Sequence, residues 1–517
     1  MAKIERTKNA TRNIVFGMIL RIYQTFVPFL MRTAMIYTLG VQYLGLNSLF
    51  TSILSVLNLA ELGVGSAMVY SMYKPIVEDD EKTICALMKL YKIYYRIIGL
   101  VIAIVGGILT PFVPQLISGE VPGGLNVYVL YLLNLAATVC SYWLFAYKGS
   151  ILQAYQRTDI VSKVTLITST IQYVAQIIIL FIWKDYYLYV IIMLLAQIMN
   201  NIITALEAEK LYPKYKAKGK LPSEEVKSIN RRIRDLFTAK LGGVIVNSAD
   251  TLVISAFLGL TVLAVYQNYY FIITAVIGFV TVFFNSCTAG IGNSLLTETK
   301  EKNFQDLNKF TFLISCIAGI CSSCFLGIFQ PFMTLWVGKD YLLPFSAVVC
   351  LVIYYYIYEI NQLLNLYKDA GGIWHEDRFR PLVTAIVNLG INLIMVQIWG
   401  IYGVLLSTAL SMLFVGMPWL FYNLFTTMFE KKQLIGYVIK IFQYALVSLA
   451  ACTIVVVICG FIKGSLLIVI FLRAVICVVI PCLSYIIVFF RKEEFKQSVL
   501  LVDKMTKGKL NLKKFVK

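Results

Sequence analysis

The sequence predicts an all-α membrane protein that crosses the bilayer about fourteen times. Of its 517 residues, 59% are hydrophobic and 14% are charged, and the mean hydropathy is +0.78. A soluble protein would have nearer a quarter of its residues charged. Apolar runs of about 20 residues, long enough to span the hydrocarbon, recur to the C-terminus. The polar, basic residues 1–12 and the long apolar stretch after them do not resemble a signal peptide.

Fourteen apolar stretches have the length and composition of transmembrane helices. They are 14–39, 43–70, 93–112, 127–147, 160–183, 186–206, 236–259, 262–290, 308–330, 342–367, 380–399, 402–425, 437–460 and 465–490. If the N-terminus is cytoplasmic, every second loop is cytoplasmic too, and the basic residues gather in those loops. The opposite loops hold only Lys184, Lys339 and Lys463. This alternation predicts that both termini are cytoplasmic. It also explains the net charge of +19, so the charge does not indicate a nucleic-acid partner.

The chain is predicted to consist of two six-helix lobes and an appended helix pair. Aligning Leu39 with Leu258 places Arg21 opposite Lys240, as a parallel duplication would. The predicted segments are a lobe at 1–206, a basic cytoplasmic linker at 207–235, a second lobe at 236–426, two further transmembrane helices within 427–490, and a basic cytoplasmic tail at 491–517. The tail alternates basic and apolar residues. It therefore fits either a helix lying on the membrane surface or a loosely ordered segment.

Two arginines lie inside the first apolar stretch. Arg21 and Arg32 are eleven residues apart, which places them within about 20° of each other on one helix face. An Arg at the bilayer centre costs roughly 3 kcal/mol, and it cannot lose its charge. Together with Gln24, the pair predicts a polar cavity that binds an anion.

Other ionisable residues also lie at membrane depth, namely Glu61, Lys240, Asp250, Glu359 and Arg473. Lys240 and Asn247 share a helix face, and Asp250 is turned from Lys240 by about 80°. The residues predicted to bind substrate are Arg21, Gln24, Arg32, Lys240 and Asn247, and those predicted to couple or gate transport are Glu61, Asp250 and Glu359. The alternatives are that the cations reach out to lipid headgroups, and that the two glutamates are packed counter-ions. Arg473 belongs to the appended pair, away from a central site.

Metal, redox and catalytic chemistry have little support in the sequence. The eleven cysteines lie mostly within apolar stretches, Cys321 and Cys324 have no neighbouring His or acid, and His375 is the only histidine. The longest external loop, 113–126, is too short to carry a catalytic domain. We expect no cofactor, no metal and no enzymatic activity.

Three stretches carry a resemblance to a known family. They are LGVQYLGLNSLFTSILSVLNLAELGVGSAMVYSMYKPI, SAFLGLTVLAVYQNYYFII and RPLVTAIVNLGINLIMVQIWGIYGVLLSTALS. The sequence is similar to the polysaccharide flippases of the multidrug/oligosaccharidyl-lipid/polysaccharide (MOP) exporter superfamily, over nearly its whole length. The resemblance implies a fold like that of the multidrug and toxic-compound extrusion (MATE) transporters, with two extra helices.

The resemblance also implies a function. The protein would move an undecaprenyl-diphosphate-linked oligosaccharide from the cytoplasmic to the outer leaflet of the bacterial cytoplasmic membrane, for cell-surface polysaccharide synthesis. Its expected partners are this substrate, membrane lipids, and polysaccharide polymerase and glycosyltransferase machinery, with no nucleic acid. The alternatives of the same fold are a cation-coupled multidrug exporter and a peptidoglycan-precursor flippase. A membrane glycosyltransferase or polymerase, and a structural partner in an assembly complex, are the alternatives of other classes.

Overall fold

The computed structural model describes residues 6–119 and 121–505, except for a few side chains within the helices. Helices make up almost all of these two ranges, and no strand occurs in them. The predicted all-α class is therefore confirmed. The chain divides into two compact units between Ala264 and Val265, called here the N-terminal and the C-terminal unit. The predicted segment boundaries, with a linker at 207–235, stay a prediction.

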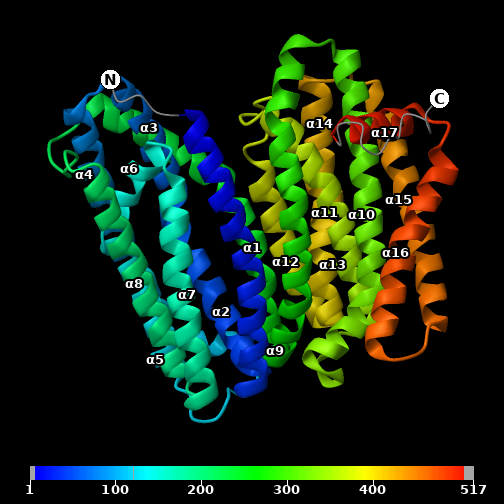
Figure 1. Ribbon diagram of the computed structural model, residues 1–517, viewed down its shortest axis with the longest axis horizontal. Coiled ribbons are helices and arrows are strands. Elements are labelled where there is room, and N and C mark those ends of the chain that lie inside the picture. The colour runs from blue at the N-terminus through cyan, green and yellow to red at the C-terminus, as the bar shows by residue number, and fades with distance from the viewer. Residues whose placement is uncertain (1–5, 120, 506–517) are drawn as a thin grey trace. The chain divides into compact units, whose positions relative to one another are not determined.

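The N-terminal unit is a bundle of long helices (Figure 1). Its helices are α1 (Arg6–Thr38), α2 (Val41–Leu57), α3 (Val64–Glu78), α4 (Glu81–Leu109), α5 (Val127–Trp143), α6 (Gly149–Ala154), α7 (Thr158–Ile182), α8 (Tyr186–Leu211) and the first part of α9 (Ser223–Thr297). Helix α7 packs against α1 on one side and against α8 on the other, and α5 packs against α4 and α8. The apolar surface of α1 that stays exposed, including Phe26 and Leu30, suits contact with lipid.

Helix α9 breaks at Gly259, the last residue of the seventh predicted stretch. The backbone of Gly259 has φ 87° and ψ 172°, a conformation that residues with a Cβ rarely adopt. A Cβ there would also lie 2.7 Å from the carbonyl oxygen of Ser118. The amide of Ser118 donates to the carbonyl of Ser255 at 2.9 Å. The loop after α4 thus holds the first part of α9 within the N-terminal unit.

The predicted number of fourteen spans stays a prediction. In the described part, eleven helices are long and apolar enough to cross a membrane, or twelve if the bent pair Val127–Trp143 and Ala146–Ala154 is one span. Helix α1 is not among them, and α9 counts once although it covers two predicted stretches. The chain is nevertheless a membrane protein with many spans.

The C-terminal unit is built around α10. Its helices are the last part of α9, α10 (Lys300–Val337), α11 (Phe345–Ala370), α12 (Arg380–Trp399), α13 (Ile401–Ser411), α14 (Met417–Thr427), α15 (Gln433–Phe461), α16 (Leu466–Phe489) and α17 (Glu493–Met505). Helix α10 packs against α11 and also against the appended pair α15 and α16 (Figure 1). Small residues allow this approach: a Cβ on Gly327 would lie 2.4 Å from Sγ of Cys477.

Part of the tail is a helix that packs on α10. Ser498 of α17 donates to the carbonyl of Lys309 at 3.4 Å, and the ring of Phe495 contacts that of Phe312. Glu494 forms an ion pair with Lys440 of α15. Partial burial opposes charge on Glu494, but the hydrogen bond from Lys440 and the backbone outweigh it, so the pKa of this carboxyl lies below its usual value. Residues 506–517 of the predicted tail lie outside the described residues.

Three helices of the C-terminal unit meet at a buried ion pair. Arg380, at the start of α12, donates to both carboxylate oxygens of Asp377, at 2.6 and 2.7 Å. Arg380 also donates to Asn365 of α11 at 2.7 Å, and Asn423 of α14 donates to Asp377 at 3.0 Å. Asp377 is 2% exposed and Arg380 is 6% exposed. Arg380, the first residue of the predicted stretch 380–399, therefore has a structural role.

Arg473 replaces a hydrogen bond that a proline removes from α10. Its Nη1 donates to the carbonyl oxygen of Gly327 at 3.2 Å. Pro331 follows Gly327 by four residues and has no N–H, so the helix leaves that carbonyl without its usual donor. The structure thus places Arg473 in helix packing, in line with its expected distance from a central site.

The variant Arg473→Leu is expected to lower the free energy of unfolding by about 1–3 kcal/mol, because it leaves the carbonyl of Gly327 unpaired. In a Pro331→Ala background the same change should cost less, since alanine at that position supplies the missing N–H. Denaturant unfolding of the four proteins in detergent would measure both effects. Additive losses would contradict a link between Arg473 and Pro331.

Candidate functional site

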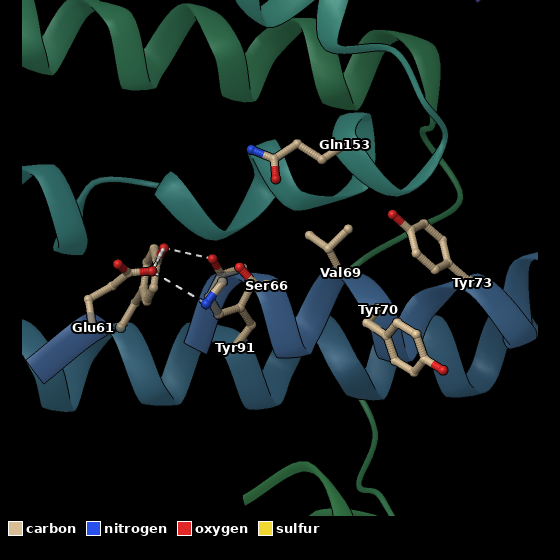
Figure 2. A pocket seen from close by; sticks show the side chains of 9 residues that line it. Glu61, Ser66, Val69, Tyr70, Tyr73, Tyr91 and Gln153 are labelled. Carbon is tan, nitrogen blue, oxygen red and sulfur yellow. Dashed lines mark hydrogen bonds between the residues drawn. The ribbon is translucent and has the colours of Figure 1, made fainter. Parts of the chain in front are cut away.

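The N-terminal unit contains a cavity of about 490 Å³ beside α3, α4 and α6 (Figure 2). Its volume lies within the range of about 300–1,000 Å³ that is usual for small-molecule sites. Most lining residues have polar side chains. The lining consists of Glu61, Gly65, Ser66, Val69, Tyr70, Tyr73, Tyr91, Tyr95 and Gln153. The cavity therefore joins a predicted functional carboxylate, Glu61, to residues that the sequence did not single out.

A break in the second predicted stretch positions Glu61. Helix α2 ends in a 3-10 turn, Asn58–Glu61, and Gly63 then adopts φ 90°. A Cβ on Gly63 would lie 2.7 Å from Cβ of Leu236, so both the space and the backbone favour glycine. Helix α3 starts after this break. The N–H of Gly65, in its first turn, has no acceptor within the helix and donates to Oε1 of Glu61 at 3.3 Å.

Tyrosines continue the hydrogen bonding away from Glu61. The hydroxyl of Tyr95 donates to Oε1 of Glu61 at 3.3 Å, and the hydroxyl of Tyr91 donates to that of Tyr95 at 2.6 Å. The ring of Tyr142 meets that of Tyr95 edge to face at 5.3 Å, and its hydroxyl donates to Asn58 at 3.1 Å. The network fixes Oε1. Its Oε2 makes no hydrogen bond within the described part of the chain.

The first part of α9 lies beside this network and brings cations to it. The hydroxyl of Tyr94 donates to Asn230 at 2.6 Å. Arg232 lies over the ring of Tyr70, 4.7 Å from its centroid. Lys240, further along α9, attracts Glu61 electrostatically. Two of the predicted functional residues, Glu61 and Lys240, thus act on each other although 179 positions separate them in the sequence.

Four predicted substrate-binding residues, Arg21, Gln24, Arg32 and Lys240, are not among the described residues that line this cavity. Arg21 and Gln24 are exposed on α1, whereas Arg32 is half-buried and interacts electrostatically with Tyr189 of α8. Asp250 is also half-buried, and the side chain of Asn247 lies outside the described residues. The assignment of these residues to one anion site stays a prediction.

Glu359 lies in α11 of the C-terminal unit and is 1% exposed. Neither of its carboxylate oxygens has a hydrogen-bond partner in the described part of the chain. Tyr355, Tyr358 and Cys321 are near enough to interact with it electrostatically. A buried carboxylate without a partner is costly, and a bound proton or cation would reduce this cost. The coupling or gating role of Glu359 stays a prediction.

The spacing of two tyrosines in the sequence could have indicated part of this cavity, although the sequence analysis did not single them out. Tyr91 and Tyr95 are four apart and so share a helix face. Gln153 had no such signal, because it reaches the cavity from α6, 58 positions after Tyr95. Within the described residues, no group of three or more His, Cys, Asp or Glu side chains is arranged to hold a metal ion.

Solved structures of transporters share this fold. The lipid II flippase MurJ, in an inward closed conformation, matches 92% of this chain and 99% of its own, with a TM-score of 0.63 and 15% identity. An inward-facing multidrug resistance MATE family transporter of the MOP superfamily matches 81% of this chain and 98% of its own, with a TM-score of 0.62 and 16% identity. A mutant of the Vibrio cholerae MATE transporter VcmN matches 81% of this chain over 96% of its own length, with a TM-score of 0.54 and 15% identity.

At this level of identity the comparisons show the fold alone. The predicted MATE-like fold with additional helices is confirmed. No known family profile matches the sequence, and no curated protein matches it.

Proposed function

We propose that this protein is a MOP-superfamily transporter that moves an undecaprenyl-diphosphate-linked oligosaccharide from the cytoplasmic to the outer leaflet of a bacterial cytoplasmic membrane. One observation carries the proposal: the fold match to a lipid II flippase extends over 92% of the chain, against 81% for the MATE transporter of nearly equal TM-score. The additional part of this chain that the flippase matches is about as long as the appended pair α15 and α16 together. This supports a lipid-linked substrate, and the resemblance of the sequence to polysaccharide flippases supports the oligosaccharide lipid over lipid II.

The charges within the membrane fit such a substrate. A diphosphate with a polar glycan cannot cross about 30 Å of hydrocarbon unaided. The guanidinium of Arg32 matches phosphate with paired hydrogen bonds, and Lys240 adds a second cation on another helix. In the proposed mechanism these residues, with Arg21, Gln24 and Asn247, hold the diphosphate while the polyprenyl chain stays in lipid.

Alternating access would expose the bound headgroup to each side in turn. Glu61, Asp250 and Glu359 are proposed to couple or gate this movement. Glu359 is the strongest of the three, because its buried carboxylate has no hydrogen-bond partner among the described residues. The proposal includes cytoplasmic termini, no enzymatic activity, and work beside polysaccharide polymerases and glycosyltransferases.

The test is a reconstituted flipping assay. Purified protein in proteoliposomes would receive a fluorescent undecaprenyl-diphosphate oligosaccharide, with parallel samples of lipid II and ethidium. Imposed pH, Na⁺ and voltage gradients would identify the energy source. We expect the oligosaccharide lipid to reach the opposite leaflet faster than in empty liposomes. Transport of ethidium alone would point to a multidrug exporter, and transport of lipid II alone to a peptidoglycan-precursor flippase. Either result would refute the proposal.

A further inference from the structure

The cavity beside Glu61 differs from an ordinary apolar ligand pocket. Small-molecule sites are mostly lined by apolar side chains with a few polar groups. Here Val69 is the one lining side chain that is wholly apolar, and the others carry a hydroxyl, an amide or a carboxylate, apart from the glycine. Such a lining suits a ligand that is itself covered with hydrogen-bonding groups.

The charge of the cavity selects a neutral ligand. No Lys or Arg is among the described lining residues, and Arg232 lies over the ring of Tyr70, so a phosphate beside Glu61 would meet a carboxylate with no cation in the lining itself. An organic cation would find tyrosine rings and Glu61, which is a favourable combination in itself. However, Lys240 already acts on this carboxylate, and its charge opposes a second cation. Neutral hydroxyl groups avoid both conflicts.

Hydrogen-bonding groups lie on opposite walls of the cavity. Glu61 is held at Oε1 by Gly65 and Tyr95, which leaves Oε2 to accept from a ligand. Figure 2 shows Gln153 across the cavity from α3, on α6. The Gln153 side chain is exposed, and its amide offers both a donor and an acceptor. A ligand with hydroxyls on two edges would reach both walls.

Aromatic rings provide the remaining surface. Tyr70 and Tyr73 meet edge to face with centroids 6.1 Å apart, and both are exposed. Arg232 covers part of the Tyr70 ring. A pyranose has apolar C–H faces and polar hydroxyl edges. It therefore pairs with tyrosine, whose ring is apolar and whose hydroxyl is polar.

We propose that this cavity binds one neutral sugar unit of the transported glycan, with Glu61 and Gln153 bonding its hydroxyls and the tyrosines contacting its ring. The inference rests on the proposed function, because it takes the ligand to be the substrate's headgroup. Arg21 and Arg32, which are assigned to the diphosphate, are not among the lining residues of this cavity. Lys240, also assigned to the diphosphate, acts on Glu61, so the sugar site would adjoin the diphosphate site at this residue.

The first test measures binding without transport. Saturation-transfer NMR would follow methyl glycosides of neutral hexoses with the purified protein, alongside tetramethylammonium and inorganic pyrophosphate. We expect at least one glycoside to bind, and Gln153→Leu to weaken it five- to tenfold. Gln115→Leu is the matched control: Gln115 is exposed in the turn after α4, outside the cavity, and should leave binding unchanged. Binding of tetramethylammonium or pyrophosphate in this cavity, or no glycoside binding, would overturn the inference.

The second test separates this inference from the proposed function. Proteoliposomes would be supplied with undecaprenyl diphosphate, either bare or carrying its oligosaccharide. We expect Gln153→Leu to slow the glycosylated carrier at least fivefold and to leave the bare carrier unchanged. Equal slowing of both carriers, or of neither, would refute the sugar site while the flippase function stands. A wild-type protein that binds glycosides yet flips neither carrier would refute the function and support the site.

Discussion

Replacing Arg32 by alanine is expected to reduce export of the polysaccharide at least a hundredfold, while the protein stays in the membrane. Arg32 is half-buried on α1 and supplies the guanidinium that the proposed mechanism needs for the diphosphate. Loss of a charge-assisted, bidentate contact costs about 1.5–3 kcal/mol for each hydrogen bond, and two such bonds give this magnitude. Arg21→Ala is expected to abolish export as well, because both residues are assigned to the same anion.

The accompanying variants make the result specific. Arg32→Lys keeps the charge but loses the planar, paired geometry, so it should retain only part of the activity. Arg231→Ala removes an exposed cation near the start of α9, and export should stay normal. Export would be measured as surface polysaccharide in a strain lacking the native gene, with membrane abundance checked by immunoblot. Normal export from the double variant Arg21→Ala/Arg32→Ala would refute the anion site.

The variant Asp377→Ala is expected to destabilise the C-terminal unit by about 3–5 kcal/mol. The change leaves Arg380 buried without its carboxylate, and an unpaired buried charge is more costly than the pair itself. The loss should be large enough to reduce the amount of folded protein in membranes. Thermal unfolding in detergent, followed by the fluorescence of tryptophan, would measure it.

Two further variants test the physical reason. Asp377→Leu combined with Arg380→Met should cost less than Asp377→Ala, since Arg380 no longer stays buried without a carboxylate. Lys368, which lies 3.6 Å from Asp377, keeps Asp369 as a partner at 2.9 Å in both variants. Glu78→Ala breaks an exposed pair with Lys74, whose atoms lie 3.8 Å apart, and should change stability by less than about 1 kcal/mol. A double variant as unstable as Asp377→Ala would contradict the role given to the buried charge.

The membrane helices were the most predictable part of this protein. A helix in lipid must satisfy its own backbone and present apolar side chains over about 20 residues, so the signal is local in sequence. The break at Gly259 was predictable for a similar reason, because the two apolar stretches around it are together too long for one span. The 3-10 turn before Gly63 was not predicted, since the apolar pattern of 43–70 runs through it.

The candidate site was predictable only in part. Glu61 was found because a carboxylate at membrane depth needs a partner or water. The groups that act on it come from other helices: Tyr95 of α4 donates a hydrogen bond to it, and Lys240 of α9 acts on it electrostatically. The role of Arg473 could not be predicted for the same reason. Its partner is the carbonyl oxygen of Gly327, which Pro331 leaves without a donor in α10. No spacing within the sequence indicates such contacts.

By itself, the sequence determined the all-α membrane class and the positions at which charged residues interrupt the apolar stretches. These depend on the transfer of single side chains and short segments between water and lipid, which composition and order describe. The tertiary structure alone decided which charges are structural and which line a cavity. Arg380 pairs with Asp377, Arg473 supports α10, and Glu61 faces a polar cavity with Gln153. The reason is physical: the energy of a buried charge depends on partners within a few ångströms, and folding brings those partners from distant segments.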